Sequence, residues 1–88
     1  MEAAKLRGIT RRFNRYRFPE CRARVIKNGG NSLVVEFDGT ANFFCCFDEH
    51  FEDYRIMLKD HGEEFKIEEV KEKGGKFMVR YKKSTASP

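Results

Sequence analysis

Apolar side chains near the start of the chain recur at spacings of three and four residues. Leu6, Ile9, Phe13 and Tyr16 follow this spacing, which places them on one face of an α-helix. A proline shortly after the pattern ends the helix, because its ring cannot continue the helical hydrogen bonds. We therefore predict a helix over residues 3–17 whose four apolar residues pack into a core.

Two pairs of segments alternate between apolar and polar residues, as β-strands with one buried face do. The first pair is ECRARVIK and SLVVEFDG, separated by a turn that contains Gly29 and Gly30. The second pair is EFKIEEVK and KFMVRYKK, on either side of Gly74 and Gly75. Adjacent glycines accept the positive φ of tight turns, so each pair is predicted to form a β-hairpin. The positions expected to face the core are Cys21, Ala23, Val25, Leu33, Val35, Phe37, Phe65, Ile67, Phe77, Val79 and Tyr81.

A second amphipathic segment lies between the two hairpins. Phe47, Phe51, Tyr54 and Leu58 form its apolar stripe at helical spacing. A glycine follows shortly after the stripe, where helices commonly end. We predict a helix over about residues 48–60.

The elements therefore follow the order αββαββ. We predict a two-layer α+β fold, with a four-stranded antiparallel sheet and both helices packed on one of its faces. This order is a permuted form of the ferredoxin-like βαββαβ arrangement. The chain is too short for a second core, so we expect residues 1–83 to form one domain and residues 84–88 a flexible tail.

The two αββ units also align with each other at a shift of 44 or 45 residues. The shift superposes the apolar stripes of the two helices and the inward positions of the two hairpins, such as Val35 over Val79. An internal duplication would explain this match and would give the fold a pseudo-two-fold axis. Any two amphipathic αββ units would align comparably well, and the sequence leaves both explanations open.

Composition narrows the class of protein. No apolar run approaches the roughly 18 residues of a membrane span, so we expect no membrane partner. The first residues include no long apolar stretch, and we expect no signal peptide. Three cysteines, an odd number, do not make a disulfide framework, which favours a reducing cytoplasm. Abundant Lys and Glu with no Gln are weakly typical of a thermophile.

The segment ANFFCCFDEH contains the residues that first suggest a metal or redox centre, Cys45, Cys46 and His50. Zinc-binding cysteines usually stand two residues apart, because that spacing turns both thiolates toward one metal. Neighbouring side chains in an extended segment point to opposite faces, and a disulfide between neighbours is strained. Cys21 belongs to the first hairpin, and the sequence does not say whether it lies near the other two. We interpret the cysteines as buried apolar residues, with a thiol or metal centre as the minority alternative.

The polar residues of the second helix have structural explanations. Asp48 stands where a short carboxylate caps the first N–H groups, and Phe47 can pack back onto the first turns. His50 falls beside the apolar stripe and is predicted to face solvent, while His61 stands near the helix end, where a cation is favoured. The sequence has no nucleophile, phosphate-loop or dinucleotide motif, so we predict a non-enzymatic protein without a cofactor or a resident metal.

Charge is strongly segregated along the chain. Residues 1–27 carry a net charge of +7, residues 28–72 a net charge of −8 and residues 73–88 a net charge of +5. No acidic residue lies between Glu2 and Glu20. The first helix is therefore basic along its whole length.

The arginines of this helix are the most unusual feature of the sequence. Arg7, Arg11 and Arg15 recur every four residues, and like charges at that spacing destabilise an isolated helix by a few tenths of a kcal/mol per pair. Something must offset this repulsion. The candidates are acidic residues of the middle segment brought close by the fold, or a polyanion.

The leading hypothesis is a small protein that binds structured RNA or the ribosome through its phosphate backbone, since arginine forks match phosphate oxygens. The outer face of the sheet is expected to be mixed in charge and poor in aromatic residues, so bases should not stack there. The alternative is a protein-interaction module whose basic helix meets an acidic partner surface, such as Glu49, Glu52 and Asp53 of a second copy. The residues predicted to bind nucleic acid are Arg7, Arg11, Arg12, Arg15, Arg17, Arg22, Arg24, Lys82 and Lys83.

Overall fold

The computed structural model describes residues 1–17, 21–39 and 47–84, apart from the side chains of residues 47 and 48. The predicted αββαββ order is confirmed, and every predicted element begins and ends within two residues of its expected bounds. The elements are α1 (Ala3–Arg17), β1 (Arg22–Asn28), β2 (Ser32–Asp38), α2 (Phe47–Asp60), β3 (Phe65–Lys73) and β4 (Lys76–Lys83).

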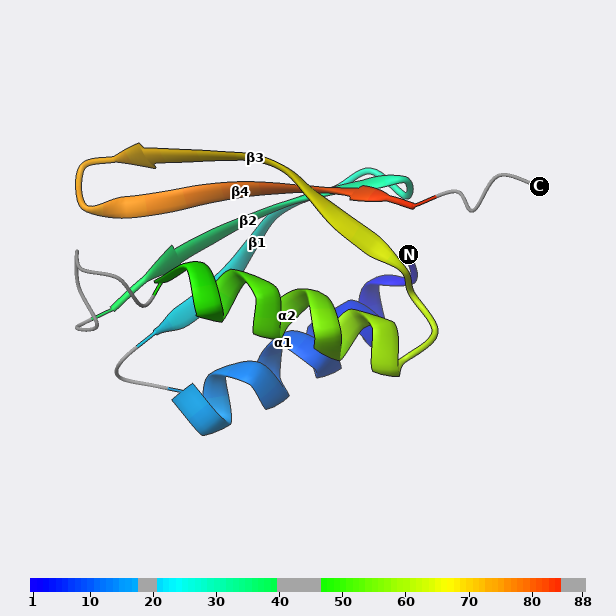
Figure 1. The fold of residues 1–88 in the computed structure, drawn as a ribbon. Helices are drawn as coiled ribbons and strands as arrows, with labels where there is room; N and C mark the ends of the chain where they lie inside the picture. The colour runs from blue at the N-terminus through cyan, green and yellow to red at the C-terminus, as the bar shows by residue number, and fades with distance from the viewer. Residues whose placement is uncertain (18–20, 40–46, 85–88) are drawn as a thin grey trace.

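The four strands form one antiparallel sheet in the order β1-β2-β4-β3, and both helices cover the same face of it (Figure 1). The two hairpins therefore meet through their second strands, β2 and β4. Val35 lies directly opposite Val79 in this central pairing, and these are the residues that a shift of 44 superposes. A pseudo-two-fold axis between the central strands thus relates the two αββ units in space, while a duplication in evolution stays a prediction.

The core between the sheet and the helices is built around aromatic rings. The ring of Phe37, on β2, lies 4.9 Å from that of Phe51, 5.7 Å from that of Tyr54 and 5.8 Å from that of Phe13, measured between centroids. Aromatic pairs at such distances stabilise a fold by about 0.5–1.5 kcal/mol beyond the burial of their surface. The central strand therefore holds both helices through one ring.

Two buried tyrosine hydroxyls form hydrogen bonds in the core, one between the two helices and one between the sheet and α2. The Tyr54 hydroxyl lies 2.7 Å from that of Thr10 on α1, and the Tyr81 hydroxyl donates to the Phe51 carbonyl at 2.9 Å. Burial raises the pKa of Tyr54 to about 12, although the Thr10 hydrogen bond partly opposes this, and burial also raises the pKa of Tyr81. Both phenols therefore stay neutral at physiological pH.

Two side chains do not lie where the sequence predicts. Tyr16 is 67% exposed instead of buried, because its spacing identifies the helix face but not the point along the helix where the core ends. The last core residue on that face of α1 is Phe13. His50 is half-buried instead of facing solvent, because α1 packs beside the start of α2 and brings the Phe13 ring 6.4 Å from the imidazole.

Candidate nucleic-acid interface

α1 presents four arginines to solvent. Burial of Leu6, Ile9 and Phe13 fixes which face of the helix is turned away from the core. Among the residues that the structure describes, no carboxylate lies within 4.0 Å of any of these four guanidinium groups. The four exposed residues, called the arginine face below, are Arg7, Arg11, Arg12 and Arg15.

Two other basic residues of α1 are paired with acids from distant parts of the chain. Lys5 Nζ lies 3.0 Å from Glu63 Oε2, and this hydrogen bond lowers the pKa of the Glu63 carboxyl. Arg17 lies 3.0 Å from Asp53 on α2, and its guanidinium also stacks 4.6 Å above the Phe13 ring. The acidic segment of residues 28–72 therefore neutralises part of the basic charge of α1. The charge of the arginine face is the part that it does not neutralise.

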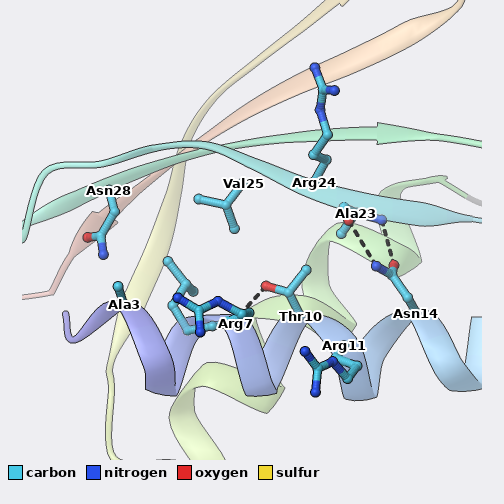
Figure 2. A pocket seen from close by; sticks show the side chains of 10 residues that line it. Ala3, Arg7, Thr10, Arg11, Asn14, Ala23, Arg24, Val25 and Asn28 are labelled. Atoms are coloured by element: carbon cyan, nitrogen blue, oxygen red, sulfur yellow. Dashed lines mark hydrogen bonds between the residues drawn. The ribbon is translucent and has the colours of Figure 1, made fainter.

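A groove of about 480 Å³ runs between α1 and the edge strand β1 (Figure 2). Its walls combine small apolar side chains with polar ones, and Arg7 and Arg11 come from the helix side. Figure 2 shows Arg24 pointing from β1 away from the helix, toward the other face of the sheet. The residues that line the groove are Ala3, Leu6, Arg7, Thr10, Arg11, Asn14, Ala23, Arg24, Val25 and Asn28.

Asn14 holds α1 against the edge of the sheet at one end of this groove. Its Nδ2 donates to the Ala23 carbonyl at 3.0 Å, and the Ala23 amide donates to its Oδ1 at 2.7 Å. One side-chain amide thus pairs with β1 as the backbone of a neighbouring strand would. These two hydrogen bonds, called the clamp below, hold this part of α1 against β1.

The remaining residues predicted to bind nucleic acid do not join the arginine face. Arg22, Arg24 and Lys82 lie on the open face of the sheet, opposite the helices. Arg24 is 3.6 Å from Glu36 there. Lys83 lies on the helix side of β4, with Nζ 3.7 Å from Glu63. The nine predicted residues therefore divide between two faces of the molecule.

Sequence reasoning missed one exposed aromatic residue beside the arginine face. Tyr16 stands four residues after Arg12, which makes them neighbours on the surface of α1. The helical spacing assigns Tyr16 to the core, so the sequence carries no signal of its exposure. It also does not predict the groove, which depends on how closely α1 approaches β1.

The predicted alternative of a thiol or metal centre falls largely on residues outside the described part. Cys45 and Cys46 are outside it, as are the side chains of Phe47 and Asp48 with their predicted capping contacts. Cys21 is fully buried in the core. Within the described residues, no cluster of three His, Cys, Asp or Glu side chains is arranged to hold a metal ion.

Two further findings bear on the class of protein. Among the described residues, no helix is both long enough and apolar enough to cross a membrane. Comparison with protein-family models, with curated proteins and with solved structures finds no match to this chain. A functional assignment must therefore come from the chemistry of the surfaces described above.

Proposed function

We propose that this protein binds the phosphate backbone of structured RNA through the arginine face of α1. The observation that supports this proposal is that the basic residues of α1 differ in whether they pair with acids. Arg17 and Lys5 pair with acids of their own chain at 3.0 Å, whereas the four arginines between them have no acid within 4.0 Å in the described residues. A planar guanidinium donates two parallel hydrogen bonds to phosphate oxygens, and four of them on one helix match a run of phosphates.

The manner of binding follows from which other groups surround these arginines. In the groove beside Arg7 and Arg11, the uncharged polar side chains of Thr10, Asn14 and Asn28 already form hydrogen bonds within the chain, which leaves little for hydrogen bonding to base edges. Phosphate contacts position a nucleic acid without reading its sequence. We therefore expect affinity that depends strongly on salt and only slightly on sequence, with Tyr16 available to stack on one unpaired base.

The test is a titration of fluorescently labelled RNA hairpin at several salt concentrations. Replacing Arg11 and Arg15 together by Glu should weaken binding by at least about a hundredfold at low salt, since each lost charged contact is worth roughly tenfold. The slope of log K against log salt should also become shallower, by roughly 0.7–0.9 for each phosphate contact that is removed.

The matched control makes the same charge change at the same spacing on α2. Arg55→Glu with Lys59→Glu alters net charge equally but leaves the arginine face intact. We expect this control to retain most of the affinity and the full salt slope. Equal losses in the two double variants would refute a role for the arginine face, as would absence of binding by the unmodified protein at low salt.

A second candidate function is the binding of an acidic protein segment by the same surface. The observation that favours it is the position of the groove beside β1, because an edge strand can accept an added strand from a partner at residues other than Ala23, which Asn14 already pairs. The acids of α2 are less suited as that partner in a second copy, since Asp53 already pairs with Arg17 and Glu52 with Arg55 at 2.7 Å. Sedimentation at low and high salt, with and without an acidic peptide, tests this candidate. A monomer that ignores the peptide under both conditions would exclude it.

A further inference from the structure

The open face of the sheet has more basic than acidic residues. Strand register places nine basic residues on this face, together with the acids Glu36, Asp38 and Glu69. A fourth acid, Glu68, lies on the same face beside Arg80 and Lys82. Each of these acids lies within 4.0 Å of at least one of the basic residues. The face is therefore mixed in charge, as the sequence predicts, and its net charge over the described strands is positive. The basic residues are Arg22, Arg24, Lys27, Lys66, Lys71, Lys73, Lys76, Arg80 and Lys82.

This face has a hollow of about 470 Å³ in which positive charge converges. Lys27 reaches it from β1, and Arg80 and Lys82 reach it from the central strand β4. The pairing of Val34 with both Lys27 and Arg80 brings two of these side chains to opposite sides of β2. The complete lining is Lys27, Asn31, Ser32, Val34, Glu68, Arg80 and Lys82.

The acid in this hollow holds its neighbours only loosely. Glu68 lies 3.8 Å from Arg80 Nη1 and 3.9 Å from Lys82 Nζ, distances longer than a hydrogen bond. Glu69, outside the lining of the hollow, lies 3.6 Å from Arg80 Nη2, which is also longer than a hydrogen bond. Lys27 has no carboxylate within 4.0 Å among the described residues. Ion pairs of this kind at a surface contribute little stability, so an incoming anion could replace Glu68 as the partner of these cations at small cost.

We propose that this hollow is a binding site for a phosphate group. The Arg80 guanidinium supplies a planar fork, Lys27 and Lys82 supply point charges, and the Ser32 hydroxyl adds a neutral donor. The phosphate belongs either to a nucleic-acid backbone or to a free phosphorylated molecule, which present the same chemistry. The site lies on the face of the sheet opposite α1, so this proposal does not depend on the arginine face.

The experiment follows backbone amide signals of the isotope-labelled protein by nuclear magnetic resonance. Three probes are titrated separately at low salt: inorganic phosphate, pyrophosphate and a short single-stranded RNA. We expect the amides of Lys27, Ser32 and Lys82 to shift saturably with at least one probe. Shifts with phosphate or pyrophosphate alone assign a free ligand, whereas shifts with RNA alone assign the backbone, and either result supports the site.

Variants test whether probe binding depends on the basic residues that meet in the hollow, or only on the total charge of the face. Lys82→Ala and Lys27→Ala should each weaken binding of the active probe by about tenfold, as loss of a charge-assisted hydrogen bond does. Lys73→Ala removes the same charge from the same face outside the hollow and should have little effect.

Removal of the acid gives a prediction in the opposite direction. Glu68→Gln leaves no carboxylate in the lining of the hollow and should tighten binding severalfold, because Lys82 then has no acid within 4.0 Å among the described residues and Arg80 keeps only Glu69. Glu36→Gln, on the same face but outside the hollow, is the control. Equal effects for hollow and control variants would show diffuse attraction and overturn the site, as would the absence of shifts with all three probes.

The two proposals can fail separately. In the Arg11→Glu, Arg15→Glu double variant, the shifts at Lys27, Ser32 and Lys82 should persist with inorganic phosphate or pyrophosphate if a free ligand is correct. If RNA is the active probe and only the α1 variants abolish its binding, the hollow is excluded and the arginine face stands. If only the hollow variants abolish RNA binding, the arginine face is excluded and the hollow is supported.

Discussion

The helices α1 and α2 occupy equivalent places in the two αββ units, yet their outer faces differ in charge. Among the described side chains, each helix packs three large residues fully into the core, Leu6, Ile9 and Phe13 in α1 and Phe51, Tyr54 and Leu58 in α2. On α2, Arg55 pairs with Glu52 three residues before it, and Asp53 pairs with Arg17. On α1, the arginine face has no such partners within the described residues.

The buried faces of the two helices are needed for folding, whereas the charges on their outer faces are not. Both helices bury an apolar face against the pseudo-symmetric sheet, so they have the same role in packing. Packing gives no reason for the arginine face, because the same place in the other unit is filled by a helix with a net charge of −3. Surface charge that lowers the stability of a helix is more readily explained by a ligand than by the fold.

The largest expected effect tests whether the inner faces are in fact equivalent. Phe13→Ala should lower the free energy of unfolding by about 3–5 kcal/mol and Leu58→Ala by about 2–5 kcal/mol, because both side chains are fully buried. Urea unfolding monitored by circular dichroism measures both. The exposed residues Tyr16 and Ile56 provide controls, and their Ala variants should change stability by less than about 0.5 kcal/mol. A loss below about 1 kcal/mol for either buried residue would break the equivalence.

An intermediate loss of stability is expected at the Asn14 clamp, a contact between helix and strand that the second αββ unit, over its described residues, lacks at the equivalent position. Asn14→Ala leaves the Ala23 amide and carbonyl without their side-chain partner and should cost about 2 kcal/mol. The position that a shift of 45 gives in α2 is Lys59, which is exposed, and Lys59→Ala should be nearly neutral. Faster hydrogen exchange of the Ala23 amide in Asn14→Ala would locate the loss at the clamp. Unchanged exchange and stability would show that the clamp is dispensable.

Much of the fold could be predicted because its signals are local. The spacing of Leu6, Ile9 and Phe13 defines the helix face, and the alternation along each hairpin defines the inward side of the sheet. The adjacent glycines at the hairpin turns were also informative, since Gly30 has a φ of 84° and Gly74 a φ of 61°. These features depend on residues a few positions apart.

The candidate site could be predicted only in part, because its decisive contacts are long-range. The sequence places nine basic residues together by type, but it cannot show that Asp53, 36 positions away, neutralises Arg17. It also cannot show that Lys27, Arg80 and Lys82 meet in one hollow, since this depends on the pairing of β2 with β4. The arginine face was predictable as a pattern, and its lack of partners required the fold.

The smallest expected effect is also the sharpest test of the comparison, because its sign is unusual. Arg11 has like charges four residues before and after it, at Arg7 and Arg15. Arg11→Gln removes both repulsions while keeping helix propensity nearly unchanged, so α1 should gain about 0.4–1 kcal/mol of stability. The measurement is the urea midpoint at low salt, and the gain should shrink at high salt, where screening already weakens the repulsion.

The same substitution on α2 should act in the opposite direction. Arg55→Gln removes the partner of Glu52 and should leave stability unchanged or slightly lower. If Arg11→Gln stabilises the protein while weakening RNA binding by about tenfold, the arginine costs stability and contributes to binding. A destabilised Arg11→Gln variant would instead mean that the arginine face supports the fold. In that case the contrast between the two helices would no longer point to a ligand.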